Sequence, residues 1–206
     1  MKFTDYQRLA VRTARRLPTY SQDLQHAALG LGSEAGELAL TVSQAFMRMP
    51  LEMKNFSKEI GDVSWYAALL CELLGFEFAE MVTDPATLSD MSPELAGAVI
   101  NRNPVAMTLL LSHFAGEMIG EIKKHVIYSQ CLDVERIRKH MILFVCTASL
   151  LADLHGFAYV EVALHDNIVK LRDRYPNAYS DEEAVLRMDK KVKDPEVAEP
   201  KLVLVQ

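Results

Sequence analysis

Apolar residues recur along most of this chain at every third or fourth position, which is the spacing of an amphipathic α-helix. The pattern predicts a first helix over residues 3–16, ended by Pro18. It predicts a second helix from Ser21, a residue type common at N-caps, to about residue 48. A third helix is predicted over residues 52–74, with Gly75 as its C-cap. No segment reads as a βαβ unit or a hairpin of strands, so the predicted fold class is all-α.

The second half of the chain shows a similar organisation after a segment rich in turn-forming residues, 83–93. Ser92 and Asn103 each precede a proline, a pairing typical of a helix N-cap and first helical position. Asp133 is a further candidate N-cap, and Leu109 is expected to lie in the core. The predicted elements are a short helix, long helices over about 104–127, 133–154 and 158–174, and a short last helix that begins at the capping-box pattern Ser180-Asp181-Glu182-Glu183.

Short sequence matches recur at a shift of eighty or eighty-one residues. Ala35-Gly36-Glu37-Leu38 matches Ala115-Gly116-Glu117-Met118, and Leu51-Glu52 matches Leu132-Asp133. Matches in the same order indicate a duplicated helical hairpin. The two hairpins, 21–76 and 104–156, are predicted to form a four-helix core within a single domain over residues 1–180. Residues 181–206 are expected to form a short helix and an extended C-terminal tail.

Composition and charge narrow the class of protein. Half of the 206 residues are hydrophobic, which predicts a substantial core, and the net charge of −6 argues against bulk binding of nucleic acid. The three cysteines form no CxxC motif, as expected for free thiols in a reducing compartment. The N-terminus lacks the apolar run of a signal peptide, and the most hydrophobic stretch, MILFVCTASLLADL, is too short to span a bilayer. The expected protein is soluble and cytoplasmic, with no membrane partner.

Two pairs of carboxylates stand out on the second and third predicted helices. Glu34 and Glu37 form one pair, and Glu59 and Asp62 form the other. Each pair has i,i+3 spacing, which places both carboxylates on one side of a helix. If the two helices pack antiparallel, the four acidic groups converge and repel one another unless a cation neutralises them. Hard oxygen ligands of this kind suit Mg²⁺ or Mn²⁺. The pattern predicts a magnesium site for a polyphosphate substrate.

Carboxylate pairs also arise by chance in a chain with 28 acidic residues, where most such groups face water. Two features favour a metal site here. Both pairs border apolar stripes, and they enclose Gly36 and Gly61. A glycine inside a helix costs roughly 1 kcal/mol relative to alanine, so it often marks a close approach of two backbones. Four convergent carboxylates would require such an approach.

Three blocks of the sequence, ALGLGSEAGEL, KEIGDVSWYAALLCELLG and DNIVKLRDRYPNAY, resemble the MazG-like nucleoside triphosphate pyrophosphohydrolases. These belong to an all-α pyrophosphatase superfamily that also contains the dimeric dUTPases. The shared pattern is ExxE, a spacer, ExxD, and a distal helix ending in N-x-x-K-L-x-x-R-Y-P. The resemblance covers roughly residues 3–76 and 158–180. Residues 77–157, which hold the second hairpin, form an insertion relative to the short members of this family.

The resemblance implies Mg²⁺-dependent hydrolysis of a nucleoside or deoxynucleoside triphosphate to the monophosphate and pyrophosphate, in nucleotide-pool control. It assigns the catalytic and metal-binding roles to Glu34, Glu37, Glu59 and Asp62. The number of ions, the carboxylate that acts as base, and the preferred base and sugar stay open. The expected substrate-binding residues are Lys170 and Arg174, which would reach the phosphates, Asn167, which would touch a phosphate or a metal-bound water, and Tyr175, Trp65 and Tyr66.

Other interpretations stay open at this stage. In the second hairpin, Phe114, His140 and Leu143 stand at the positions of Glu34, Glu59 and Asp62. Because this copy has lost its ligands, the whole chain can also be interpreted as a catalytically inactive helical scaffold of the same fold. A third possibility is release of orthophosphate in place of pyrophosphate. Trp65 and Tyr66 are as typical of a core as of a base pocket, and His26 is more typical of a structural role. The chain can be a monomer or a homodimer.

Overall fold

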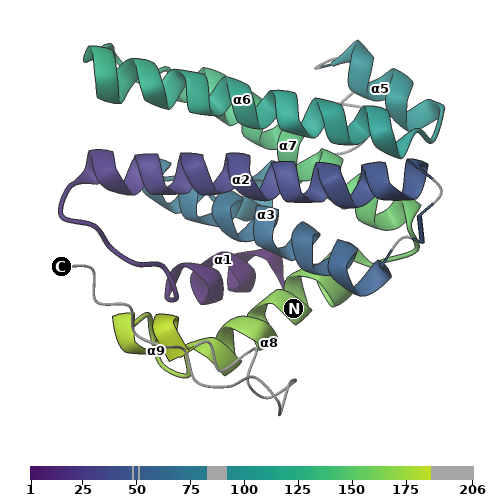
Figure 1. Cartoon of the computed structure of the whole chain (residues 1–206). Helices are drawn as coiled ribbons and strands as arrows, with labels where there is room; N and C mark the ends of the chain where they lie inside the picture. The colour runs from purple at the N-terminus through teal and green to yellow at the C-terminus, as the bar shows by residue number, and fades with distance from the viewer. Residues whose placement is uncertain (48, 51, 83–91, 187–206) are drawn as a thin grey trace, which may run out of the picture.

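The structure is a computed structural model that describes residues 1–47, 49–50, 52–82 and 92–186. Across those residues it contains helices and no strand, which confirms the predicted all-α class (Figure 1). The elements are α1 (Phe3–Val11), α2 (Tyr20–Phe46), α3 (Met53–Leu74), η1 (Phe78–Met81), α5 (Pro93–Ile100), α6 (Pro104–Tyr128), α7 (Val134–Leu154), η2 (Tyr159–Leu164), α8 (His165–Arg174) and α9 (Asp181–Leu186).

Four long helices make up the core, as the sequence predicts. The α2–α3 hairpin and the α6–α7 hairpin pack through α2 against α6 and through α3 against α7. Figure 1 shows α6 lying along α2, with α1 and α8 together on the side of the bundle away from α6. Buried apolar side chains fill the interior, among them Leu31 on α2, Ile60 on α3, Met118 on α6 and Phe144 on α7.

Each of the two hairpins makes a polar interhelical contact at corresponding positions. In the first hairpin, Asn55 on α3 donates from Nδ2 to Oγ1 of Thr41 on α2, at 3.1 Å. In the second, Nε of Arg136 on α7 lies 3.3 Å from Oε1 of Glu121 on α6. Glu121 follows Thr41 by eighty residues and Arg136 follows Asn55 by eighty-one, the shifts found in the sequence repeat. This correspondence supports duplication of one hairpin.

The ends of the helices follow the predicted capping residues with one exception. Ser92, Asn103 and Asp133 each accept a hydrogen bond from the backbone N–H three residues later, and Gly75 ends α3 in the left-handed conformation with a φ of 74°. The predicted N-cap of α2, Ser21, is wrong. Thr19 caps this helix, because its hydroxyl accepts from the Gln22 backbone while the Gln22 side chain accepts from the Thr19 backbone.

The first helix is shorter than predicted. It ends at Val11, where the hydrogen bonds change to a tighter i→i+3 pattern and side chains also donate to the carbonyl group of Ala10. Thr13 donates to Ala10 O from its hydroxyl at 2.6 Å and from its backbone N–H at 3.0 Å. Trp65 Nε1 donates to the same oxygen at 3.0 Å. The last predicted long helix also differs, since it begins as the π-helical turn η2 before continuing as α8.

Two apolar positions lie outside the core. Leu109 is 65% exposed, although the sequence pattern assigns it to the interior. Phe46, which continues the apolar stripe of α2, is 76% exposed at the end of that helix. The tail predicted for residues 187–206 and most of the segment 83–93 lie outside the described residues.

Among the described residues, one helix, α6, is long and apolar enough by length and composition to cross a membrane. The test is passed by many core helices as well, since it counts only residue types. In this structure α6 buries Leu111, Phe114 and Met118 against the rest of the bundle. Packing on α2 and α7 buries 44% of its most apolar window.

Candidate functional site

A cavity of about 670 Å³ opens between α2, α3, α8 and the chain after α1. Eight of the ten residues that the sequence predicts for the site line it. The other two, Glu59 and Asn167, are buried close to it, with exposed fractions of 2% and 4%. Segments that are far apart in sequence therefore meet at one place, as the three sequence blocks require.

Three of the four predicted carboxylates come together at one end of this cavity. Glu34 from α2 and Glu59 and Asp62 from α3 each place one oxygen within 4.8 Å of the others. Glu37 lines the same cavity but lies outside this group, because its position on α2 faces solvent. The structure therefore brings together a group of three carboxylates, with the fourth at the rim.

Glu59 has the least ordinary environment of the three. Its Oε1 accepts a hydrogen bond from Lys58 Nζ at 2.7 Å. Its Oε2 is buried and has no hydrogen-bond partner in the part of the chain that the structure describes. A buried carboxylate oxygen without a partner is costly. A cation held between the carboxylates would satisfy it, and an all-oxygen donor set fits Mg²⁺ or Mn²⁺.

The repulsion within the cluster affects the pKa of Glu34. Burial, together with the charges of Asp62, Glu37 and Glu59, raises the pKa of Glu34 from its ordinary value of 4.5 to about 7, against an opposing effect of Lys58. Like charges in a partly buried site disfavour ionisation in this way. Near neutral pH, the cluster without a cation therefore holds a proton for part of the time.

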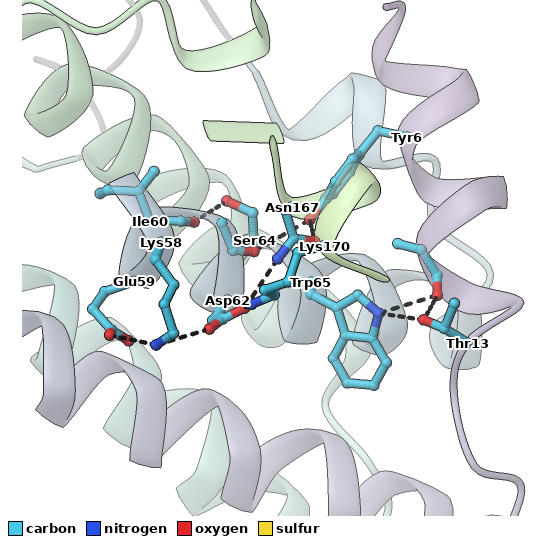
Figure 2. Close-up of polar contacts among 12 residues, drawn as sticks. Tyr6, Thr13, Lys58, Glu59, Ile60, Asp62, Ser64, Trp65, Asn167 and Lys170 are labelled. Atoms are coloured by element: carbon cyan, nitrogen blue, oxygen red, sulfur yellow. Dashed lines mark hydrogen bonds and ion pairs between the residues drawn. The ribbon is translucent and has the colours of Figure 1, made fainter. Parts of the chain in front are cut away.

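Two lysines partly neutralise the carboxylates. Lys58 lies between Glu59 and Asp62, with Nζ 3.5 Å from Asp62 Oδ2, and Lys170 from α8 contacts Asp62 Oδ1 (Figure 2). Burial lowers the pKa of Lys170, and the adjacent Asp62 charge counteracts this effect. The sequence analysis missed Lys58. Its i,i+4 spacing to Asp62 was a usable signal, because such pairs meet on a helix face.

Asn167 lies behind Asp62 and not in the cavity. Its Nδ2 donates to Asp62 Oδ1 at 2.9 Å, and its Oδ1 accepts from the hydroxyl of Tyr6 at 3.2 Å (Figure 2). The sequence predicts a contact of Asn167 with a phosphate or a metal-bound water, whereas in the structure its partners are protein groups. Tyr6 was missed, because nothing local connects it with a residue 161 positions away.

Aromatic side chains form another wall of the cavity. Trp65 lines it while its Nε1 donates to Ala10 O and to Thr13 Oγ1, both at 3.0 Å. Tyr66 packs edge-on against Trp65, with ring centroids 4.7 Å apart, and His26 lies beside both. The aromatic wall thus comes from α2 and α3, the two helices that carry the carboxylates.

The distal end of α8 closes the cavity with a cation and an aromatic ring. Arg174 lies 5.9 Å from the centroid of the Tyr175 ring, and both residues line the cavity, as predicted. Lys170 and Arg174 are one helical turn apart and reach the same space. The carboxylates and these cations therefore face a common volume.

The prediction that Gly36 marks a close approach of two helix backbones is wrong. Apart from its own stretch of helix, no atom of the described residues lies within 4 Å of the place where a Gly36 Cβ would stand. The close approach occurs six residues earlier, where a Cβ on Gly30 would overlap the ring of Tyr66. At Gly32, a Cβ would lie 2.7 Å from Ile119 Cδ1 of α6. The LGLG segment, and not the glycine within ExxE, marks the tight packing.

Comparison with models of protein families, with curated proteins and with solved structures found no match to this chain. The interpretation of the site therefore rests on the residues of the three sequence blocks and on the geometry described above.

Proposed function

We propose that this protein hydrolyses a nucleoside or deoxynucleoside triphosphate to the monophosphate and pyrophosphate, with Mg²⁺ as its cofactor. The observation that carries the proposal is the unpartnered oxygen of Glu59, buried within a group of three carboxylates at a cavity that also holds Lys170 and Arg174. A buried acidic group facing basic side chains suits a cation bound to a polyanion. The resemblance to MazG-like pyrophosphohydrolases supports the same conclusion.

The residues available for the metal are Glu34, Glu59 and Asp62, with Glu37 at the rim of the cavity. When bound, Mg²⁺ would neutralise charge on the phosphates and lower the pKa of a coordinated water. The ion would also relieve the repulsion among the carboxylates, which together with burial raises the pKa of Glu34. A Mg²⁺ ion bound to both the carboxylates and the substrate phosphates would therefore stabilise the ionised carboxylates.

The cations of the cavity are suited to the phosphate chain. Lys170 and Arg174 lie on one helix and line the cavity together with Lys58. Preorganised positive charges of this kind stabilise the charge that develops on the phosphate oxygens during transfer. Lys58 contacts Glu59 and Asp62 and also lines the cavity, so a phosphate oxygen that enters can compete for its ammonium group.

The aromatic wall is suited to the nucleobase. Trp65 and Tyr66 present rings to a cavity whose volume of about 670 Å³ is within the range of small-molecule sites. A planar base can stack on or meet the edge of such rings, which contributes affinity with little dependence on base identity. The proposed substrate is therefore a nucleotide, and the preferred base is a question for experiment.

The test is a release assay over the eight common ribo- and deoxyribonucleoside triphosphates with Mg²⁺, resolving pyrophosphate from orthophosphate. Glu59→Gln should abolish turnover, because it removes the charge at the buried centre of the cluster. Glu121→Gln is the matched control, since Glu121 is also a buried carboxylate but belongs to the second hairpin. Pyrophosphate release that Glu59→Gln abolishes and Glu121→Gln preserves is the expected result.

Other outcomes identify the rival interpretations. Release of orthophosphate would mean that the enzyme cleaves the bond to the terminal phosphate and not the bond that releases pyrophosphate. Absence of turnover with every nucleotide, together with no effect of Mg²⁺ on thermal stability, would overturn the proposal in favour of a helical scaffold. Turnover that survives Glu59→Gln would place the reaction outside this cavity.

A further inference from the structure

A chain of hydrogen bonds connects three helices behind the carboxylate cluster. The hydroxyl of Tyr6 on α1 donates to Oδ1 of Asn167 on α8, and the amide of Asn167 donates to Asp62 on α3. The two distances are 3.2 Å and 2.9 Å. Figure 2 shows Asn167 placed between Tyr6 and Asp62. The segments joined in this way are 161 and 105 residues apart in sequence.

The direction of each hydrogen bond is fixed by the chemistry of the groups. An ionised carboxylate only accepts, so the atom of Asn167 that faces Asp62 must be its NH₂ group. The amide oxygen of Asn167 then faces Tyr6, whose hydroxyl must donate. The same hydroxyl lies 3.3 Å from the carbonyl oxygen of Gly61, which can also only accept. The one proton of the Tyr6 hydroxyl is shared between these two acceptors, and the Asn167 amide has one orientation that suits both Tyr6 and Asp62.

Little of this arrangement is exposed to solvent. Tyr6 has no exposed surface and Asn167 is 4% exposed. Asn167 does not line the main cavity, although Asp62 does. A role of Asn167 toward a substrate in that cavity must therefore pass through Asp62. Hydrogen bonds between buried groups are stronger than in water, so they restrict the orientation of the side chains that they join.

The remaining partners of Asp62 are less restrictive. Lys58 and Lys170 contact its two oxygens, but both are long side chains with several rotatable bonds. They also line the cavity, where phosphate oxygens would compete for them. Tyr6 and Asn167 have buried side chains with fewer rotatable bonds, and neither lines this cavity, although Asn167 borders a second cavity beside Lys58 and Lys170. The orientation of the Asp62 carboxylate in a loaded site would thus depend on the buried pair.

We propose that Tyr6 and Asn167 are positioning residues that hold the Asp62 carboxylate in the orientation needed to bind the cation. The inference rests on the proposed function, because it assigns Asp62 to a divalent metal. Groups that orient a metal ligand through hydrogen bonds affect metal affinity or activity by about 10- to 100-fold when removed. The substrate itself is not expected to touch either residue.

The test compares Tyr6→Phe with Tyr159→Phe in the full-length chain. Tyr159 is a matched control, because it is 4% exposed and its hydroxyl shares a hydrogen bond of 2.8 Å with Ser64 Oγ. Binding of Mn²⁺ is measured by calorimetry or by electron paramagnetic resonance. Tyr6→Phe should weaken Mn²⁺ binding by about tenfold or more, whereas Tyr159→Phe should leave it unchanged at a comparable loss of thermal stability.

Kinetics with excess metal separate positioning from direct contact with substrate. If Tyr6 and Asn167 act through Asp62, raising the Mg²⁺ concentration restores the kcat of Tyr6→Phe and of Asn167→Leu. If Asn167 binds a phosphate directly, added nucleotide restores the rate and added metal does not, which would overturn the inference. The second variant also keeps the test valid if Tyr6→Phe does not fold.

A measurement on the metal-free protein separates this inference from the proposed function. The side-chain amide of Asn167 should give protected proton signals by nuclear magnetic resonance, identified by their loss in Asn167→Leu. Tyr6→Phe should shift these signals and speed their exchange with solvent. If they are unchanged, the role of Tyr6 is overturned even where the wild type binds metal. If the wild type binds no Mn²⁺, the metal assignment fails and the inference fails with it, whatever the amide signals show.

Discussion

The ring of Tyr66 on α3 lies directly against the backbone of Gly30 on α2, where a side chain of any size would overlap it. Glu34 lies one helical turn after Gly30, and Asp62 lies one turn before Tyr66. The tight contact between the ring and the glycine therefore stands next to the point where Glu34 and Asp62 meet. Residues four apart on a helix share a face, so this contact sets the separation of the carboxylates.

Substitution of Gly30 by alanine should destabilise the protein and weaken metal binding. The added methyl group must displace the Tyr66 ring, and overpacking of this kind costs about 1–3 kcal/mol in the free energy of unfolding. Gly36→Ala is the control on the same helix, because nothing described lies near its Cβ position. It should raise the free energy of unfolding by up to about 1 kcal/mol through helix propensity. Equal effects of the two substitutions in urea unfolding would contradict this explanation.

Stability of the metal-free protein should depend on pH through Glu34. Because burial and neighbouring acids raise its pKa from 4.5 to about 7, the folded chain binds more protons than the unfolded chain between these values. This contribution to the free energy of unfolding is present below pH 4.5 and is lost as the pH rises to about 7. Glu34→Gln should therefore be similar to wild type at pH 5 and more stable at pH 8. The same difference in the free energy of unfolding between variant and wild type at both pH values would show that the pKa of Glu34 is not raised.

Helical periodicity and capping residues were sufficient to predict most of the fold. The apolar stripes of α2 and α3 and the caps at Ser92, Asn103 and Asp133 depend on residues close in sequence, so local rules apply to them. The early end of α1 was not predictable in this way. At this end Trp65 of the neighbouring helix α3 donates to the Ala10 carbonyl, a contact between residues 55 positions apart.

The same distinction separates the parts of the site. Spacing alone placed Glu34, Glu59 and Asp62 on facing helices, and the structure groups them. The position of Asn167 behind Asp62, and the part of Tyr6 in holding it, depend on the packing of α1 and α8 against α3. No pattern within one helix specifies such a contact. Glu37 was predicted to join the cluster and does not. An i,i+3 spacing places two side chains on one side of a helix, but it does not determine whether both point toward the neighbouring helix.

The single tryptophan of the chain, Trp65, should report nucleotide binding. It lines the cavity, and its indole N–H is fixed by Ala10 and Thr13, so a base that enters meets a ring of fixed orientation. A substrate nucleotide with Ca²⁺, a poor substitute for Mg²⁺ in catalysis, should change its fluorescence in a saturable manner. Pyrophosphate should bind with a much smaller change, because it lacks the base. A fluorescence change of the same size with both ligands would show that the base does not contact the aromatic wall.

The last prediction compares Glu37 with Glu117, which occupies the corresponding position in the second hairpin. Glu37 lines the cavity and its charge contributes to the raised pKa of Glu34, whereas Glu117 is paired with Arg136 at 2.5 Å. Glu37→Gln should weaken Mg²⁺ binding by several-fold, less than Glu59→Gln, because Glu37 lies outside the group of three and solvent screens its charge.

Glu117→Gln should leave Mg²⁺ affinity and turnover unchanged, since Arg136 keeps its contact with Glu121 and no cavity residue loses a partner. Calorimetric titration of the three variants with Mg²⁺ makes the comparison. A loss of affinity in Glu117→Gln as large as that in Glu37→Gln would mean that the second hairpin contributes to the site. In that case the duplication would have preserved a shared function, and the assignment of one site to the first hairpin would be wrong.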